Sequence, residues 1–194
     1  MAAALVLVGC GDNGPRAEAA ASAGPPSVTA ASQTSSFKEA DVMFAQQMIP
    51  HHQQAIQMAQ MAPSHAQSPK VKQLAAKIGA AQEQEIKTMT SWLHAWGKPV
   101  PSGMPGMMSP MPGMMGSPSP GMMSQQEMSQ LMAAHGAQFD RLFLQMMIRH
   151  HEGAVEMAKT EQARGLNPAA KKLAHKIETS QTAEIAQMQQ MLEQ

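Results

Sequence analysis

Two histidine pairs are the side chains in this sequence with the clearest capacity for chemistry. Both stand in the pattern Met-x-x-His-His, which begins at Met48 and again at Met147. If these segments are helical, Met48 can share a face with His51 or His52, and His51 can share a face with the residue seven positions on. Imidazole and thioether donors together favour soft or borderline metal ions, above all Cu(I). The predicted helical ligands are Met48, His51, His52, Met58, Met147, His150, His151 and Met157.

The same residues have a second interpretation as packing residues. Methionine fills irregular apolar cores readily, and a buried histidine can cap a neighbouring helix. Successive helical residues are displaced by ~100°, so only one histidine of each pair can lie centrally on an inward face. The sequence leaves open which one. With one cysteine in the whole chain, a structural zinc site of the usual type is disfavoured.

The two motifs belong to an internal repeat. A shift of 99 residues superimposes the second half of the chain on the first without a gap. It aligns Asp41 with Asp140, and Glu85 with Glu184. Two similar hairpins that each expose an apolar face can bury those faces against each other. The sequence therefore predicts an all-α fold, a four-helix bundle made of two repeated helical hairpins.

Apolar residues at helical spacing, bounded by capping signals, define the expected helices. The segments 36–39 and 124–127 have the Ser-x-x-Glu form of a capping box, and Ser68-Pro69 and Asn167-Pro168 each offer an N-cap followed by proline. The expected helices cover residues 37–62, 69–96, 124–134, 138–164 and 168–191.

A methionine-rich loop separates the repeats. Residues 97–123 consist almost wholly of Gly, Pro, Ser and Met, and proline repeatedly interrupts any helix. Methionine in a segment without a core has little packing purpose, so a second set of soft-metal ligands is expected. The alternatives are tolerated low complexity or a sacrificial target for oxidants. The expected loop ligands are Met104, Met107, Met108, Met111, Met114 and Met115.

The N-terminal residues predict export and lipid attachment. Cys10 follows an apolar run, and Leu7-Val8-Gly9-Cys10 resembles the bacterial lipobox, in which the signal peptide is cut before a lipid-bearing cysteine. The usual Lys/Arg-rich start is missing, so an ordinary signal peptide or an unmodified thiol is the alternative. The run is too short to span a membrane, which takes ~20 apolar residues. We expect a lipid anchor that faces the periplasm or the cell exterior.

Charge and motif content weigh against nucleic-acid binding and catalysis. Lys plus Arg and Asp plus Glu each number 14, which leaves no basic excess for nucleic acid. The chain has no phosphate-binding glycine loop, no Gly-x-Ser-x-Gly and no His-Glu-x-x-His. Di-iron bundles need Glu-x-x-His on two helices, whereas here Glu152 follows the second histidine pair and Gln53 follows the first. No enzyme is predicted.

Both motif segments resemble the signature of domain of unknown function family 305. The resemblance lies in Met48-Ile49-Pro50-His51-His52-Gln53-Gln54-Ala55-Ile56-Gln57-Met58-Ala59 and in its counterpart at 147–158, and it extends over about 37–192. It implies a ferritin-like helical bundle, an extracytoplasmic location and, as in some members, copper binding and copper tolerance. It also implies a role for the methionines and histidines of both motifs. Much of the family has no assigned function, and many members would lack the methionine-rich loop.

The expected function is extracytoplasmic, non-enzymatic binding of Cu(I) for sequestration, transfer or tolerance. A helical interaction module without metal and a ferritin-like oxidoreductase are the alternatives. The copper-delivery partner, the oligomeric state and the stoichiometry are beyond the sequence. The expected organisation is a signal peptide with lipobox at 1–10, a disordered tether at 11–36 and the bundle at 37–194, divided into repeat one at 37–96, the loop at 97–123 and repeat two at 124–194.

Overall fold

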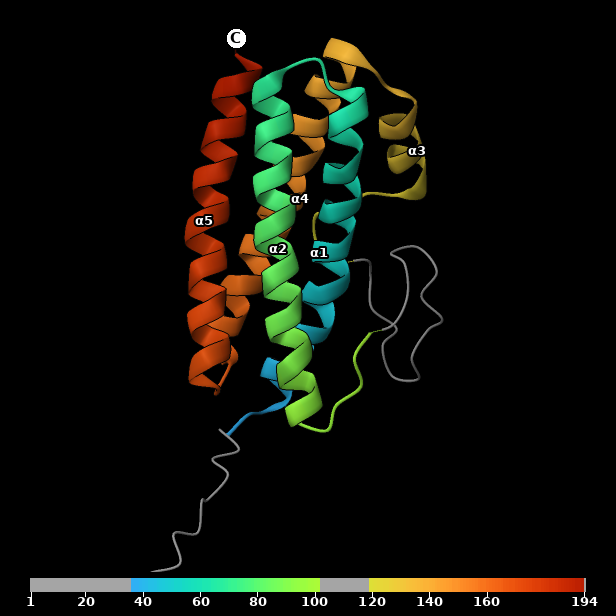
Figure 1. Ribbon diagram of the computed structural model, residues 1–194. Helices are drawn as coiled ribbons and strands as arrows, with labels where there is room; N and C mark the ends of the chain where they lie inside the picture. Colours follow the sequence, from blue (N-terminus) through green and yellow to red (C-terminus); the bar gives the residue numbers. More distant parts are fainter. Residues whose placement is uncertain (1–35, 102–118, 194) are drawn as a thin grey trace, which may run out of the picture. The chain divides into compact units, whose positions relative to one another are not determined.

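Helices form nearly all of the regular structure in the computed structural model, which describes residues 36–101 and 119–193 (Figure 1). The predicted all-α bundle is confirmed. No helix in the described ranges is long and apolar enough to cross a membrane. Cys10, most of the expected tether and the six expected loop ligands lie outside the described residues. The helices are α1 (Glu39–His65), α2 (Pro69–Ala95), α3 (Gln125–Ala133), α4 (Gly136–Arg164) and α5 (Pro168–Leu192).

Capping side chains set where most of these helices begin. The Ser68 hydroxyl accepts the Val71 N–H, and the Asn167 side chain accepts two N–H groups of α5. Ser124 forms the expected capping box with Glu127. The capping box expected at Ser36 is wrong.

In α1 the N-cap is Lys38, two residues later than expected. Its backbone N–H donates to the Asp41 carboxylate at 2.8 Å, so Asp41 rather than Glu39 closes the first turn. Asp41 is a stronger anchor there because it also binds the α4–α5 loop, accepting the N–H groups of Leu166 at 3.0 Å and Asn167 at 2.7 Å. Asp140, 99 residues on, accepts the corresponding N–H groups of the α1–α2 loop.

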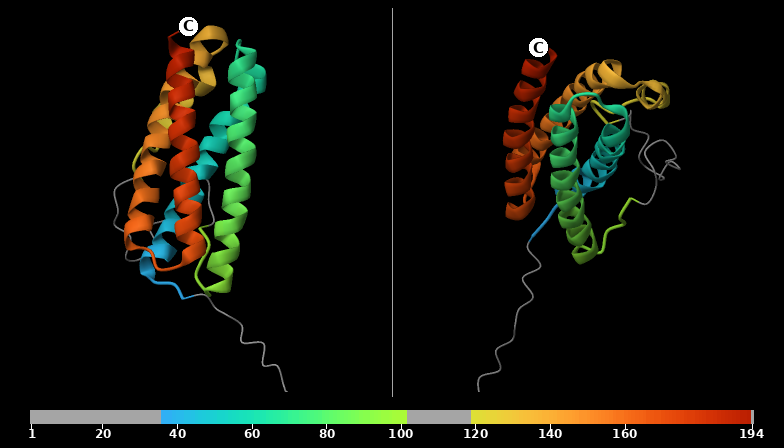
Figure 2. Two further views of the ribbon diagram at one scale, coloured as in Figure 1. Left: turned by 90° about the vertical axis from the view of Figure 1, so that its left-hand side faces the viewer. Right: turned by 45° about the horizontal axis from the view of Figure 1, so that its top comes forward.

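The bundle consists of two hairpins joined through their first helices. α1 packs on α2, α4 packs on α5, and α1 packs on α4, as Figure 2 shows. The short α3 lies against α1 and α4. Apolar residues at 42–49 of α1 share a cluster with 154–158 of α4, so these two helices run in opposite directions.

Two apolar clusters fill the bundle, and a buried polar layer separates them along every long helix. One cluster takes residues 55–66 of α1 and 139–147 of α4, and the other takes 42–49 and 154–158. Between them lie polar side chains that are fully or largely buried. We call this set the polar layer: His51, His52, Gln82, Glu85, His150, His151, Gln181 and Glu184.

Candidate metal centre

The first histidines of the two predicted pairs meet where α1 crosses α4. The rings of His51 and His150 are in contact, with centroids 3.8 Å apart and planes tilted by 40°, and all four side chains have no solvent-exposed surface. Within a pair the rings are farther apart, at 6.5 Å for His51 and His52. The first histidine of each pair therefore lies at the α1–α4 interface, and the second points elsewhere. This answers the question that the sequence left open.

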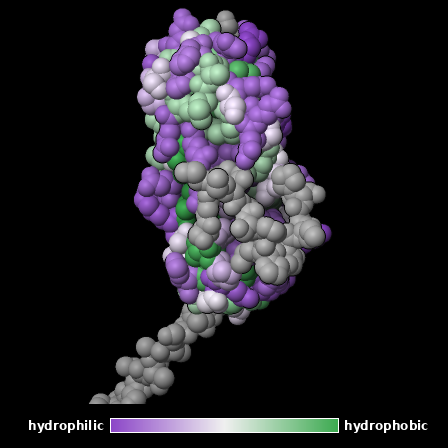
Figure 3. Space-filling model, turned by 90° about the vertical axis from the view of Figure 1, so that its right-hand side faces the viewer, coloured by the Kyte–Doolittle hydropathy of each residue, from purple (hydrophilic) through white to green (hydrophobic). Residues whose placement is uncertain are grey.

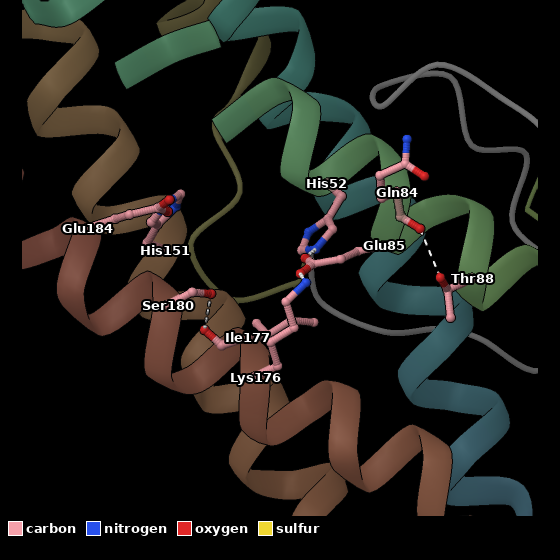
Figure 4. Close-up of polar contacts among 9 residues, drawn as sticks. All are labelled: His52, Gln84, Glu85, Thr88, His151, Lys176, Ile177, Ser180 and Glu184. Atoms are coloured by element: carbon pink, nitrogen blue, oxygen red, sulfur yellow. Dashed lines mark hydrogen bonds and ion pairs between the residues drawn. The ribbon is translucent and has the colours of Figure 1, made fainter. Parts of the chain in front are cut away.

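The second histidine of each pair points at a glutamate on the neighbouring helix (Figure 4). His52 Nε2 lies 2.9 Å from a Glu85 carboxylate oxygen, and His151 Nε2 lies 2.7 Å from Glu184. Lys176 of α5 donates to the other Glu85 oxygen at 3.2 Å. Sequence reasoning gave these glutamates no role, although their recurrence 99 residues apart was the available signal.

Burial disfavours protonation of three of these histidines, His51, His52 and His150. It lowers the pKa of His51 to about 3, helped by the charge of His52 and opposed by the Pro120 carbonyl. Burial and the other three histidines hold the His150 pKa well below its ordinary value. Burial also lowers the pKa of His52, against the pull of Glu85. Because a neutral imidazole keeps a lone pair on one nitrogen, these rings are in the protonation state that binds metal.

Several of these ring nitrogens are buried without a hydrogen-bond partner among the described residues. They are Nδ1 of all four histidines and Nε2 of His150. His51 Nε2 donates to the Pro120 carbonyl at 3.0 Å. Buried polar atoms in native proteins are nearly always paired, so a cluster of unpaired ring nitrogens fits a site for an added ligand.

The predicted methionine ligands divide between the two apolar clusters. Met48 lies in one cluster with Met157, and Met58 lies in the other with Met147. Met48 and Met58 are ten residues apart, or ~15 Å along a helix, so one ion cannot bind both. Each side of the polar layer therefore holds one of these methionines from each repeat. This grouping across repeats was not anticipated.

No three His, Cys, Asp or Glu side chains among the described residues converge as a metal-binding group. Imidazole nitrogens in the polar layer and thioether sulfurs in the clusters on both sides of it are donor types that suit Cu(I). Two carboxylates, those of Glu85 and Glu184, do reach this layer, which the sequence did not indicate. A carboxylate-bridged di-iron site of the ferritin type uses four carboxylates, two more than the layer contains.

The C-terminal end of the methionine-rich loop, from Ser119 on, is held beside the histidines by hydrogen bonds. The Gln54 side-chain amide donates to the Met123 carbonyl at 2.8 Å and accepts its N–H at 2.7 Å. Gly153, the counterpart of Gln54, lies so close to Pro120 that a Cβ there would overlap the Pro120 carbonyl. On the other flank of the loop, Gln46 donates to the Pro99 carbonyl at 2.8 Å. Both flanks are therefore held on α1.

A groove of about 1120 Å³ lies between α1, α3 and this fastened segment. Methionines line much of it, and weakly hydrophobic side chains gather on this face in Figure 3. Arg149 donates to the Met123 sulfur at 2.8 Å and forms an ion pair with Glu127 of α3. The methionines that border the groove are Met61, Met122, Met123, Met128 and Met132.

Comparison with known proteins identifies the family. The family described as Domain of unknown function (DUF305) matches residues 41–192. A putative secreted DUF305 protein from Streptomyces coelicolor is 35% identical, with a TM-score of 0.70 over 79% of this chain and 91% of that one. A DUF305 fragment from Deinococcus radiodurans is 32% identical, with a TM-score of 0.68 over 80% and 96%.

CopM in its Cu(I)-bound form is 37% identical, with a TM-score of 0.64 over 79% of this chain and 95% of that one. Structures of CopM with Cu(II) and with silver are similar as well. No curated protein matches the chain. With the family pattern covering both hairpins, the chain belongs to the DUF305 family.

Proposed function

We propose that this protein binds Cu(I) outside the cytoplasm, at the crossing of α1 and α4, and sequesters or transfers it without catalysing a reaction. The observation that carries the proposal is the set of neutral, unpaired imidazole nitrogens sealed inside the polar layer. Buried methionines lie on both sides of it. Similarity to CopM, which has been seen with copper and silver, supports the same chemistry.

The methionine-rich loop supplies a second class of Cu(I) ligand in this proposal. Its described flanks are held on α1, Pro99 through Gln46 and Pro120 through His51. Thioether sulfur takes up no proton in the ordinary pH range, so binding in the loop would continue in mild acid.

A Cu(I) titration with thermal unfolding tests the proposal. Three proteins are compared: the wild type, a variant with the six loop methionines changed to leucine, and a His51→Gln/His150→Gln variant. Copper bound in the bundle raises the melting temperature by mass action, and copper bound in the loop hardly affects it. We expect the loop variant to keep the full stabilisation and the histidine variant to lose it. Equal stabilisation of the histidine variant would contradict a bundle site.

Export and anchoring through Cys10 belong to the same proposal, which the secreted description of the Streptomyces relative supports. Mass spectrometry of protein from the membrane fraction should find a lipid-modified Cys10 as the first residue. An intact N-terminus with an unmodified thiol would show that the lipobox interpretation is wrong.

A further inference from the structure

Two glutamates outside the Met-His motifs complete the metal centre. We propose that Glu85 and Glu184 are positioning residues, which fix the tautomer of His52 and His151 so that Nδ1 of each ring carries the lone pair offered to the metal. This inference rests on the proposed function and assigns residues and ring atoms to it.

The geometry of the two pairs supports this assignment. Each glutamate oxygen lies at hydrogen-bond distance from Nε2 of its histidine, 2.9 Å for Glu85 and 2.7 Å for Glu184. An ionised carboxylate can only accept a hydrogen bond, so each Nε2 must carry the hydrogen. In a neutral imidazole the other nitrogen then has a free lone pair.

A packing histidine is expected to pair this lone pair with a hydrogen-bond donor, whereas a metal ligand leaves it free for the ion. Nδ1 of His52 and Nδ1 of His151 are both buried and have no partner among the described residues. A buried acceptor without a partner is energetically costly, and the fold holds one at each of these two equivalent positions. Ligand histidines in proteins typically donate their remaining N–H to a carboxylate, which orients the ring and makes it more basic. Both second histidines have that arrangement.

Glu85 itself is poorly placed to be a ligand. Lys176 occupies the second oxygen of Glu85 at 3.2 Å, while the first faces His52. Both oxygens of Glu85 therefore already have a hydrogen-bonding partner. The Glu184 side chain is 24% exposed against 6% for Glu85, so the Glu184 carboxylate is more accessible to solvent.

The first test is made on the metal-free wild type by long-range ¹H–¹⁵N NMR of the imidazole rings. We expect the ring hydrogen of His52 and of His151 to lie on Nε2. A Glu85→Ala/Glu184→Ala variant should lose this preference, and Glu85→Gln/Glu184→Gln should keep part of it because an amide oxygen still accepts. Hydrogen on Nδ1 in the wild type would overturn the proposal.

The second test is a titration of the same variants with Ag(I), a redox-inert stand-in for Cu(I). Removing an orienting carboxylate typically lowers metal affinity by about 10–100-fold, and we expect a loss in that range for the Ala variant and a smaller one for the Gln variant. The control is Glu83→Ala/Glu156→Ala, which removes the same charge from exposed positions. It should bind as the wild type does.

The outcomes separate this inference from the proposed function. If the Ala variant binds Ag(I) as tightly as the wild type while the His51→Gln/His150→Gln variant does not, copper binding stands and the role of the glutamates is wrong. A wild type whose bundle takes up no metal refutes the function, and the positioning role with it. If Ag(I) leaves the Nδ1 resonances of His52 and His151 in place, the assignment of the ligand atom is wrong.

Discussion

The rings of His51 in the first hairpin and His150 in the second lie in tilted contact at a centroid distance of 3.8 Å, where α1 crosses α4. They occupy equivalent positions 99 residues apart, so the contact lies at the junction of the two repeats. A metal bound to these rings would bridge the hairpins, and the stability of their association would then depend on the metal.

Glu161 is expected to weaken the bundle at alkaline pH. Burial and the neighbouring Asp41 carboxylate raise the Glu161 pKa to about 8, above its ordinary value. The folded chain therefore holds a proton that the unfolded chain releases, and stability falls as pH rises from about 4.5 to 8. Glu161→Gln should raise the free energy of unfolding at pH 8 by on the order of 1–3 kcal/mol. Urea unfolding at pH 8 and 4.5 checks this, since the gain should shrink at the lower pH. A gain equal at both pH values, or one matched by the exposed control Glu156→Gln, would contradict it.

Buried His51 should lower the stability of the bundle as pH falls, the opposite of the effect of Glu161. The His51 pKa of about 3 lies below its ordinary 6.5, so the unfolded chain binds a proton that the folded chain rejects as pH falls through this window. His51 alone should lower the free energy of unfolding by about 2 kcal/mol between pH 7.5 and 5. Metal-free protein carrying Glu161→Gln is the right background, because it removes the opposing contribution. A pH-independent free energy in that background would show that the rings are not held neutral.

Gly153→Ala should release the segment that is fastened beside His51. A methyl group at this position would overlap the Pro120 carbonyl, and overpacking of this kind typically costs about 1–3 kcal/mol. Amide exchange at Met123, whose N–H is held by Gln54, should become faster. Gly79→Ala is the matched control. A Cβ added at Gly79 would lie 3.7 Å from the Ala59 Cβ, an ordinary van der Waals contact, and alanine favours a helix. Equal behaviour of the two variants would mean that the segment does not depend on this contact.

Asp41→Asn should loosen the joint between α1 and the α4–α5 loop. The carboxylate is fully buried and accepts backbone N–H groups of Lys38, Leu166 and Asn167. The amide of asparagine has one oxygen acceptor and no charge, so we expect a loss of about 1–3 kcal/mol in urea unfolding. Asp140→Asn should lose less, because Asp140 is partly exposed. A larger loss at Asp140 would contradict this reasoning.

The sequence predicted what depends on local pattern and on the repeat. Apolar spacing, proline and capping residues located the helices to within a few residues, and the motif at Met48 located the histidines. The sequence did not predict the cap at Lys38. Asp41 closes that turn while its carboxylate also accepts the N–H of Leu166, in a loop more than a hundred residues away.

The partners inside the polar layer were also beyond the sequence. Whether Glu85 reaches His52 depends on the register between α1 and α2, which periodicity does not determine. The pairing of Met48 with Met157 follows from the opposite directions of α1 and α4, and so required the packed structure. Gly153 resembled an ordinary small residue until Pro120 was seen against it.

The most direct test of the account is X-ray absorption spectroscopy at the copper edge, on the loop variant with its six methionines changed to leucine and loaded with Cu(I). This variant leaves the bundle as the remaining proposed site. We expect a mixed shell of imidazole nitrogen and thioether sulfur, with a smaller nitrogen contribution when His51→Gln/His150→Gln is added and only His52 and His151 remain. A shell of sulfur alone, or a spectrum unchanged by the histidine substitutions, would contradict copper binding at the crossing of α1 and α4.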